Sequence, residues 1–375
     1  MKKAFEKIKL FFKNLWNSTF FKGILILIGM IIFLRLFYYI PFLGALNRKY
    51  IYPIWLICFG WISSIFPMSL EEFNIGLFLL CLSILFILLI ILIFTKHKKY
   101  KLFCIKYSKC LIMWLTIDIS IMMIVSTPLA RSPRLLERDD EKIYTIEEMQ
   151  KVRDYVLQQI NELSTKVEVD DNDYAYYSKN YVVESKKAMQ NIAEKYPLLK
   201  GYYPNAKSFI SSRILTLCGI LGVTYYDTLS VNYNNEMYST AIPATICHEY
   251  AHIKGYIRED EANFIGFIAC INYDDFFKYS GYLSILGYIN DDYRKAAKEL
   301  YVPGIKTERG YKDWTFFKPN VIEEINNSPI DQEIISDISD KINDATIKAN
   351  GDELGNISYS YVSKLVFKYY EGVLF

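Results

Sequence analysis

The chain has 375 residues, of which 52% are hydrophobic, 16% aromatic and 22% charged, a composition too apolar for a disordered protein and typical of one that enters a membrane. The formal net charge of +2 is unevenly distributed, since residues 1–101 contain 13 Lys and Arg against 3 Asp and Glu, whereas residues 102–375 contain 30 against 38. The larger C-terminal part therefore offers no basic face for phosphates, and nucleic acid is not an expected partner.

Three apolar stretches predict transmembrane helices in the first third of the chain. Residues 75–94 contain no charged side chain, and 20 helical residues match the thickness of a hydrocarbon core, about 30 Å. Residues 23–43 and 110–130 are interrupted by one charge each, Arg35 and Asp118. We expect these two side chains to pair, because a lone charge is costly in the bilayer. Residues 1–130 are thus predicted to form a membrane anchor.

Lysine residues predict how the anchor is oriented. One cluster precedes the first span and another separates the second from the third: Lys2, Lys3, Lys7, Lys9, Lys13 and Lys22, and Lys96, Lys98, Lys99, Lys101, Lys106 and Lys109. Basic connections face the cytoplasm, so three spans place residues 131–375 outside it, in a multi-pass protein of the cell membrane. The Trp-containing stretch 50–66 would reverse this order as a fourth span, and we expect it to be interfacial or re-entrant on the outer side.

The remainder, residues 131–375, is predicted to be predominantly α-helical with a small β element. Thr145 and Glu148 form a capping box ahead of a helix over 146–163 with apolar residues at helical spacing. Further helices are expected over 178–196, with Ser178 as its cap, and over 283–300, 319–326, 330–348 and 358–371. Residues 220–233 are rich in β-branched and aromatic side chains, which predicts one or two strands or a hairpin.

The residues that carry chemistry lie in the stretch PATICHEYAHIKGYIREDEANFIGF, residues 243–267. Its proline and first glycine bracket a short helix over 243–254. His248 and His252 are four residues apart and project from one helix face, where they can bind one metal ion. Glu249 is placed to take a proton from a water on that metal, the arrangement of zinc hydrolases. The chain contains only 3 histidines, and two of them belong to this motif.

A zinc site needs a third protein ligand. The familiar extension with a third histidine is excluded, because Arg258 occupies that position and cannot bind a metal. A second helix starts directly afterwards with acidic residues in its first turn. Glu259 is the favoured ligand, since Asn263 lies four residues further on the same face and can hold a ligand histidine; Glu261 is the alternative.

The pair HEYAH and EDEANFIGF resembles the signatures of the zincins that use a glutamate as third ligand. The longer block over 208–270, on a three-span anchor, resembles a family of bacterial membrane proteins defined only as a domain of unknown function (number 3810). This resemblance implies a zincin-like metallopeptidase domain over 131–375, with one zinc ion held by His248, His252 and Glu259, and Glu249 as the base. It implies no particular substrate.

Catalysis also needs groups that stabilise an oxyanion and bind the substrate. The strand-like stretch 223–233 is a candidate edge to which an extended peptide can add. The candidate hydrogen-bond donors, each of which is more often a packing residue, are Tyr225, Tyr226, Tyr233, Arg258, Tyr359 and Tyr361.

Two functions of different classes follow. The first is a membrane-anchored zinc-dependent metallopeptidase that hydrolyses peptide bonds of a peptide or protein outside the cytoplasm. The alternative is a non-catalytic or self-cleaving membrane sensor, whose zinc domain binds a partner. The presence of Glu249 favours the enzyme, because a pure binding module does not need that carboxylate. The lipid bilayer is an expected partner in both cases.

Overall fold

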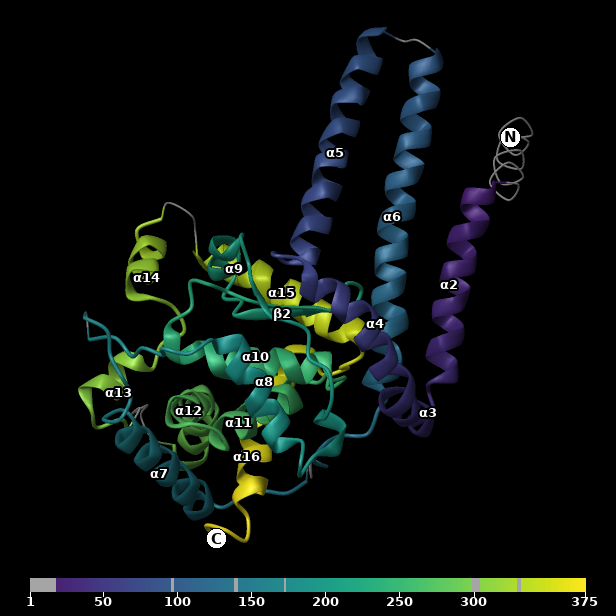
Figure 1. Ribbon diagram of the computed structural model, residues 1–375. Helices are drawn as coiled ribbons and strands as arrows, with labels where there is room; N and C mark the ends of the chain where they lie inside the picture. The colour runs from purple at the N-terminus through teal and green to yellow at the C-terminus, as the bar shows by residue number, and fades with distance from the viewer. Residues whose placement is uncertain (1–17, 96–97, 138–140, 172, 299–303, 329–331) are drawn as a thin grey trace.

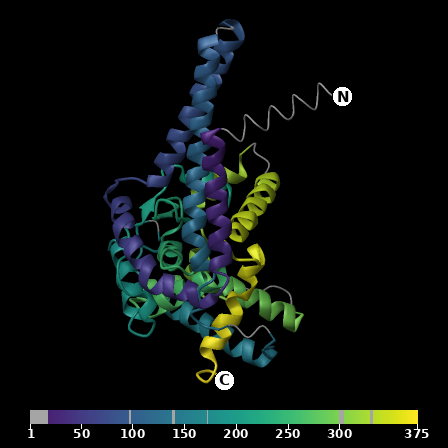
Figure 2. The same ribbon diagram turned by 90° about the vertical axis from the view of Figure 1, so that its right-hand side faces the viewer.

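The computed structural model describes residues 18–95, 98–137, 141–171, 173–298, 304–328 and 332–375 (Figure 1). These residues are mostly helical and include one small sheet of three strands. The globular part lies at one end of a group of long apolar helices (Figures 1 and 2). The predicted fold class, predominantly α with a small β element behind three apolar helices, is confirmed at this level.

Three helices are long and apolar enough to cross a membrane: α2 (Thr19–Phe37), α5 (Leu70–Thr95) and α6 (Lys98–Ala130). Helices α5 and α6 form an antiparallel hairpin, and α2 lies beside α6 (Figure 1). The three predicted apolar helices are present, with different bounds. Helix α2 ends at Phe37 rather than at 43, because Pro41 begins a separate short helix, α3 (Pro41–Leu46).

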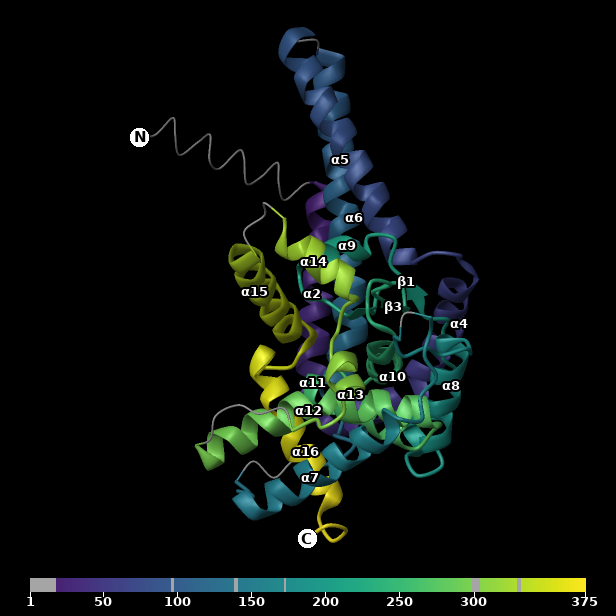
Figure 3. The same ribbon diagram turned by 90° about the vertical axis from the view of Figure 1, so that its left-hand side faces the viewer.

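Helix α6 begins at Lys98 and not at 110, so the basic stretch between the spans is helical as well. It pairs with α5 along its length, and the Tyr107 hydroxyl donates to the carbonyl of Cys81 at 3.0 Å. The first described residues of α2, the C-terminal end of α5 and the N-terminal end of α6 lie at the same end of the three helices. This end points away from the globular part (Figures 1 and 3). Six lysines of the two predicted clusters lie outside the described residues: Lys2, Lys3, Lys7, Lys9, Lys13 and Lys96.

The expected pair of Arg35 and Asp118 does not form. Arg35 occupies the last turn of α2, at the globular end of the span, and donates to the carbonyl of Ala349 at 3.4 Å. Asp118 accepts a hydrogen bond from the Asn74 amide at 3.2 Å. The prediction was wrong because it extended the first span to residue 43, which placed Arg35 deeper in the membrane.

The stretch predicted to be interfacial begins in a five-residue turn of π-helix, η1 (Asn47–Ile51), and continues as α4 (Tyr52–Ile65). Helix α4, 14 residues long, continues from η1 and packs on the globular part. The Tyr52 hydroxyl donates to the carbonyl of Ile253 at 2.8 Å, and Leu56 is buried on the same face. The opposite face exposes apolar side chains, among them Trp61.

The globular part contains ten α-helices among the described residues: α7 (Ile146–Leu163), α8 (Tyr181–Ile192), α9 (Ser212–Leu217), α10 (Ile242–Ile253), α11 (Glu259–Ile271), α12 (Asp275–Ala297), α13 (Glu308–Asp313), α14 (Pro319–Asn326), α15 (Gln332–Asn350) and α16 (Val362–Tyr370). Short 3₁₀ turns occur at Pro197–Leu199, Ser239–Ala241 and Gly355–Tyr361.

The predicted helix bounds agree with the structure to different degrees. Helices α7 and α14 match, and the capping box at the start of α7 is present. Asn180 rather than Ser178 caps α8, because its side chain reaches the amide of Val183. Helix α12 starts at Asp275, well before 283, since Asp274 caps it. The stretch 358–371 is a 3₁₀ turn followed by α16, while 299–300 and 330–331 lie outside the described residues.

The sheet has the strand order β1-β3-β2, from β1 (Lys207–Ser208), β2 (Gly222–Tyr225) and β3 (Ser230–Tyr233). Strands β2 and β3 form the antiparallel hairpin predicted for 220–233, and β1 runs parallel to β3. Helices α10 and α11 lie at the centre of the globular part, where they contact each other and are surrounded by α8, α12, α16 and the hairpin (Figure 1). Both carry the motif residues.

Candidate metal centre

Helices α10 and α11 cross closely enough for their side chains to share one site. Helix α10 ends at a left-handed glycine, Gly255, whose φ of 91° turns the chain into α11. Gly266 lies at the crossing, where a β-carbon would stand 3.1 Å from the carbonyl oxygen of Ala244 and 3.1 Å from the amide nitrogen of His248. A glycine at this position therefore lets α11 approach the backbone of the histidine helix.

His248, His252 and Glu259 converge at this crossing. The Nε2 atom of His248 lies 3.4 Å from Oε2 of Glu259, and Nε2 of His252 lies 3.4 Å from Oε1 of the same carboxylate. All three ligand atoms lie within 4.8 Å of one another. Ligand atoms bound about 2.1 Å from a tetrahedral ion are about 3.4 Å apart, so the spacing suits one metal ion.

Two further observations show that these side chains fit a metal. Oε2 of Glu259 is a buried carboxylate oxygen without a hydrogen-bond donor among the described residues. Nδ1 of His252 lies 2.8 Å from the carbonyl oxygen of Tyr256, so Nδ1 carries a proton and Nε2 is the nitrogen that faces Glu259 and would bind a metal. Two imidazoles and one carboxylate form a donor set that occurs with transition-metal ions, among them zinc in hydrolases.

The proton affinities of the three groups are strongly coupled. Burial lowers the pKa of His248 to about 4, and the neighbouring His252 adds to that effect. Burial also acts to lower the pKa of His252, but the carboxylate of Glu259 outweighs it and raises the value to about 9. Burial opposes ionisation of Glu259, yet the histidines lower its pKa to about 2. The carboxylate of Glu259 thus stabilises the positive charge of His252, while burial keeps His248 neutral.

Glu249 lies on the same helix with its carboxylate directed toward β2. The Thr224 hydroxyl donates to Oε2 of Glu249 at 2.7 Å, and Oε1 stands 3.9 Å from Nε2 of His248. A β-carbon on Gly222 would lie 2.6 Å from Oε1, so this glycine leaves room for the carboxylate. Burial raises the pKa of Glu249 to about 7, and the bond from Thr224 acts in the opposite direction. This value suits a general base near neutral pH.

A cleft of about 680 Å³ opens beside these residues and gives access to them. His248, Glu249 and Asn263 line it, together with residues of α12, residues 218–222 and residues of α15. Tyr288 and Tyr359 also line the cleft near Glu259. Burial raises the pKa of Tyr288 to about 12 and that of Tyr359 well above its usual range, so both phenols keep their protons and can donate hydrogen bonds.

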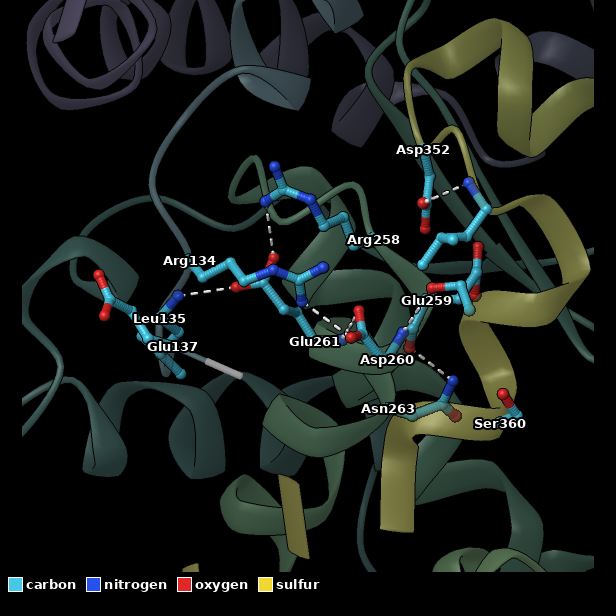
Figure 4. A network of polar contacts seen from close by, with 12 residues as sticks. Arg134, Leu135, Glu137, Arg258, Glu259, Asp260, Glu261, Asn263, Asp352 and Ser360 are labelled. Atoms are coloured by element: carbon cyan, nitrogen blue, oxygen red, sulfur yellow. Dashed lines mark hydrogen bonds and ion pairs between the residues drawn. The ribbon is translucent and has the colours of Figure 1, made fainter. Parts of the chain in front are cut away.

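The two candidate glutamates, Glu259 and Glu261, both lie in the first turn of α11, but their side chains point in different directions (Figure 4). Glu261 turns away from the histidines, where its carboxylate accepts from the amide of Leu135 at 2.7 Å and from Arg258 at 3.1 Å. Asp260 accepts from Arg134 at 2.8 Å. Glu259 is therefore the carboxylate that the fold brings to the histidines. The Asn263 amide donates to the backbone carbonyl of Glu259 at 2.8 Å, within the helix.

Five of the six predicted hydrogen-bond donors lie outside the cleft lining: Tyr225, Tyr226, Tyr233, Arg258 and Tyr361. The Tyr226 hydroxyl donates to the carbonyl of His252 at 3.3 Å, and Tyr233 belongs to β3. The guanidinium of Arg258 is directed to the backbone carbonyl of Ala130 at 3.0 Å and to Glu261. These contacts hold the site's elements in place.

The sequence did not point to Gly222, Thr224 or Tyr288. Thr224 lay within the predicted strand. Its hydroxyl bonds to Glu249 only because β2, paired with β3, packs against α10. Tyr288 occurs among 32 tyrosines, and no local pattern distinguishes it. Tyr359 was a candidate, and the structure places it at the cleft.

Comparison with known proteins defines the family of the chain. No curated protein and no solved structure matches it. The model of one family, described as "Protein of unknown function (DUF3810)", matches residues 48–367, which include every residue of the metal centre. The chain therefore belongs to the DUF3810 family of proteins of unknown function.

Proposed function

We propose that this protein is a membrane-anchored, zinc-dependent metallopeptidase of the zincin type that hydrolyses peptide bonds outside the cytoplasm. The observation that carries the proposal is the convergence of His248, His252 and Glu259 beside a buried Glu249 at an accessible cleft. A metal ligand set alone suits a structural site, whereas an adjacent buried carboxylate with a pKa near 7 suits catalysis.

The two histidines and Glu259 would hold the zinc ion, which supplies a Lewis acid for the scissile carbonyl. Glu249 accepts a proton from the attacking water as its oxygen bonds to the carbonyl carbon. When the C–N bond breaks, Glu249 returns this proton to the amine nitrogen of the leaving peptide, so the carboxylate is regenerated. The phenols of Tyr288 and Tyr359, which line the cleft, would donate to the oxyanion.

Strand β2 supports a polypeptide substrate. It pairs only with β3 among the described strands, and an extended chain would add along its other edge. Gly222 at its start lines the cleft, and Thr224 contacts Glu249. A peptide added along this edge passes the base.

The extracytoplasmic location rests on the basic residues of the anchor. Lys22 of α2 and Lys98, Lys99 and Lys101 of α6 belong to the end of the spans opposite the globular part (Figure 1). Because such basic ends face the cytoplasm, the globular part is assigned to the other side.

The test uses the full-length chain, purified in detergent micelles. Metal content is measured by mass spectrometry, and hydrolysis by release of fluorescence from a library of quenched peptides. We expect about one zinc per chain in the wild type and in Glu249→Gln, but little in His248→Ala, because two ligands bind far more weakly than three. Hydrolysis is expected to fall by a factor of about 10² to 10⁴ in Glu249→Gln.

His97→Ala is the matched control, since His97 is the one histidine outside the motif. It is expected to retain both metal and activity. Absence of metal in the wild type, or full hydrolysis by Glu249→Gln, would contradict the proposal. Stoichiometric zinc without cleavage of any peptide would instead favour the sensor.

A further inference from the structure

The cleft is bounded on the side of the membrane spans by residues 218–222 and by α15. We call these two parts, together with α9, which directly precedes residue 218, the roof. Residues 218–222 line the cleft, as do Ser339, Asp340 and Asn343 of α15. The Ser339 hydroxyl donates to the carbonyl of Cys218 at 2.8 Å and joins the two parts. The outer surface of the roof is therefore separated from the cleft by one layer of helix.

The outward side of α15 combines apolar and charged side chains, as helices that lie at a membrane interface do. Its inward side carries Ser339 and Asn343, whereas Ile334, Ile338 and Ile342, spaced four residues apart, are 57%, 53% and 62% exposed. Lys341 and Asp337, 73% and 64% exposed, form an ion pair among these isoleucines. The segment at α9 repeats this pattern, with Ile210 at 72% and Ile214 at 63% exposure. Both parts of the roof thus turn apolar side chains outward.

The roof is continuous with the membrane spans. Glu72, in the first turn of α5, accepts hydrogen bonds from the amides of Ile210 and Ser211 at 2.9 and 2.8 Å. At the other end, Arg35 of α2 donates to the carbonyl of Ala349 in α15. Helices α9 and α15 accordingly lie on the face of the globular part from which α5 rises (Figures 1 and 3).

We propose that the outer surface of the roof lies in the headgroup region of the phospholipid bilayer. The cleft beneath it therefore receives polypeptide segments that adjoin the membrane, such as the stretch next to the anchor of another membrane protein. The occupant of the apolar surface is the bilayer because the spans of the same chain fix the roof beside it, and outward isoleucines gain from contact with acyl chains. The substrate class rests on the proposed function, whereas the lipid contact does not.

The first experiment tests the lipid contact without reference to catalysis. A photoreactive benzoylphenylalanine replaces Ile338 in the full-length chain, reconstituted in nanodiscs of phosphatidylethanolamine and phosphatidylglycerol. Val373 is the matched control position, because it is an aliphatic residue with 72% exposure near the C-terminus, at the end of the molecule away from the spans (Figure 1). Illumination is expected to attach phospholipid at position 338 and not at position 373. Equal labelling, or none at position 338, would overturn the lipid contact.

The second experiment tests the substrate class with a quenched peptide that the protein cleaves in micelles. The same peptide is offered free or attached by a short spacer to phosphatidylethanolamine in the nanodisc. We expect the wild type to cleave the attached form faster by about tenfold or more, because the roof and the attached peptide are held at the same bilayer surface. Ile338→Glu should lose this preference and keep the rate on free peptide, while Val373→Glu keeps both.

The outcomes separate the two proposals. Equal rates on free and attached peptide, with lipid labelling at position 338, would refute the substrate class and leave the peptidase intact. If no peptide is cleaved although zinc is bound, the peptidase fails, the substrate class fails with it, and the labelling result alone decides the membrane contact.

Discussion

The carboxylate of Glu249 shows how burial, a neighbouring histidine and one hydrogen bond set the proton affinity of a candidate base. Burial favours the neutral form and raises the pKa from 4.5 to about 7, while the charge of His252 and the Thr224 hydroxyl stabilise the ionised form. In the metal-free protein the neutral carboxyl is the form that the fold prefers. The stabilisation of the folded state by the protonated carboxyl of Glu249 is complete below pH 4.5 and is lost as the pH rises through about 7.

Replacing Thr224 by valine is expected to move the acid limb of the pH profile to higher pH. The substitution removes the donor to Glu249 at nearly constant volume, which raises the pKa of the base, and only the ionised base is active. A shift of about one pH unit would lower kcat/KM below pH 7 by about tenfold. Peptide hydrolysis measured between pH 5 and 9 tests this expectation. Thr224→Ser keeps the hydroxyl and should keep the wild-type limb; an unmoved limb in Thr224→Val would show that the bond does not tune the base.

At the scale of elements, the crossing of α10 and α11 brings ligands from two helices together. His248 and His252 belong to one helix and Glu259 to the first turn of the next, so their spacing depends on how closely the helices approach. Gly266 determines this approach, because a β-carbon there meets the backbone of α10 rather than a flexible side chain. Backbone atoms cannot move aside independently, so the helices must separate.

Gly266→Ala is expected to lower the free energy of unfolding by about 1–3 kcal/mol, the range for overpacking a core, and to weaken metal binding. Gly287→Ala on α12 is the control, since no atom lies within 4 Å of its added β-carbon. Alanine has the higher helix propensity, so the control should be neutral or more stable. Denaturant titration in micelles measures both variants. Equal free energies of unfolding of the two variants would mean that α11 can move away from α10 without loss of stability.

At the scale of the whole molecule, the anchor and the metal centre are joined by polar contacts just after α6. The carbonyl of Ala130 accepts from Arg258, and Arg134 pairs with Asp260, the residue next to Glu259 (Figure 4). The Asp260 side chain is fully buried and that of Arg134 is 19% exposed. The end of a span is thus fixed to the helix that carries a metal ligand.

Arg134→Met is expected to cost about 3–5 kcal/mol of stability, because it leaves the Asp260 carboxylate buried without this partner. Arg294→Met is the matched control. Arg294 pairs with Asp291, and the two side chains are 44% and 55% exposed, so its loss should cost about 1 kcal/mol or less. Thermal unfolding of both variants with and without added zinc provides the measurement. If Arg134→Met costs no more than the control, the contact is not a structural link between anchor and site.

Local patterns in the sequence determined the features that depend on neighbouring residues. The apolar runs of α2, α5 and α6, the capping box of α7, the β2–β3 hairpin and the spacing of His248 and His252 are all set within a few turns of chain. These features follow from helical periodicity, side-chain capping and strand propensity, which act without the rest of the fold.

Only the tertiary structure decided which distant groups meet. It brings Glu259 rather than Glu261 to the histidines, because Leu135 and Arg258 hold Glu261 on the other side of α11. Thr224 meets Glu249 across 25 residues, and Arg35 reaches the end of α15 rather than Asp118. Such contacts are set by how whole helices and strands pack, and no local pattern of residues encodes that packing.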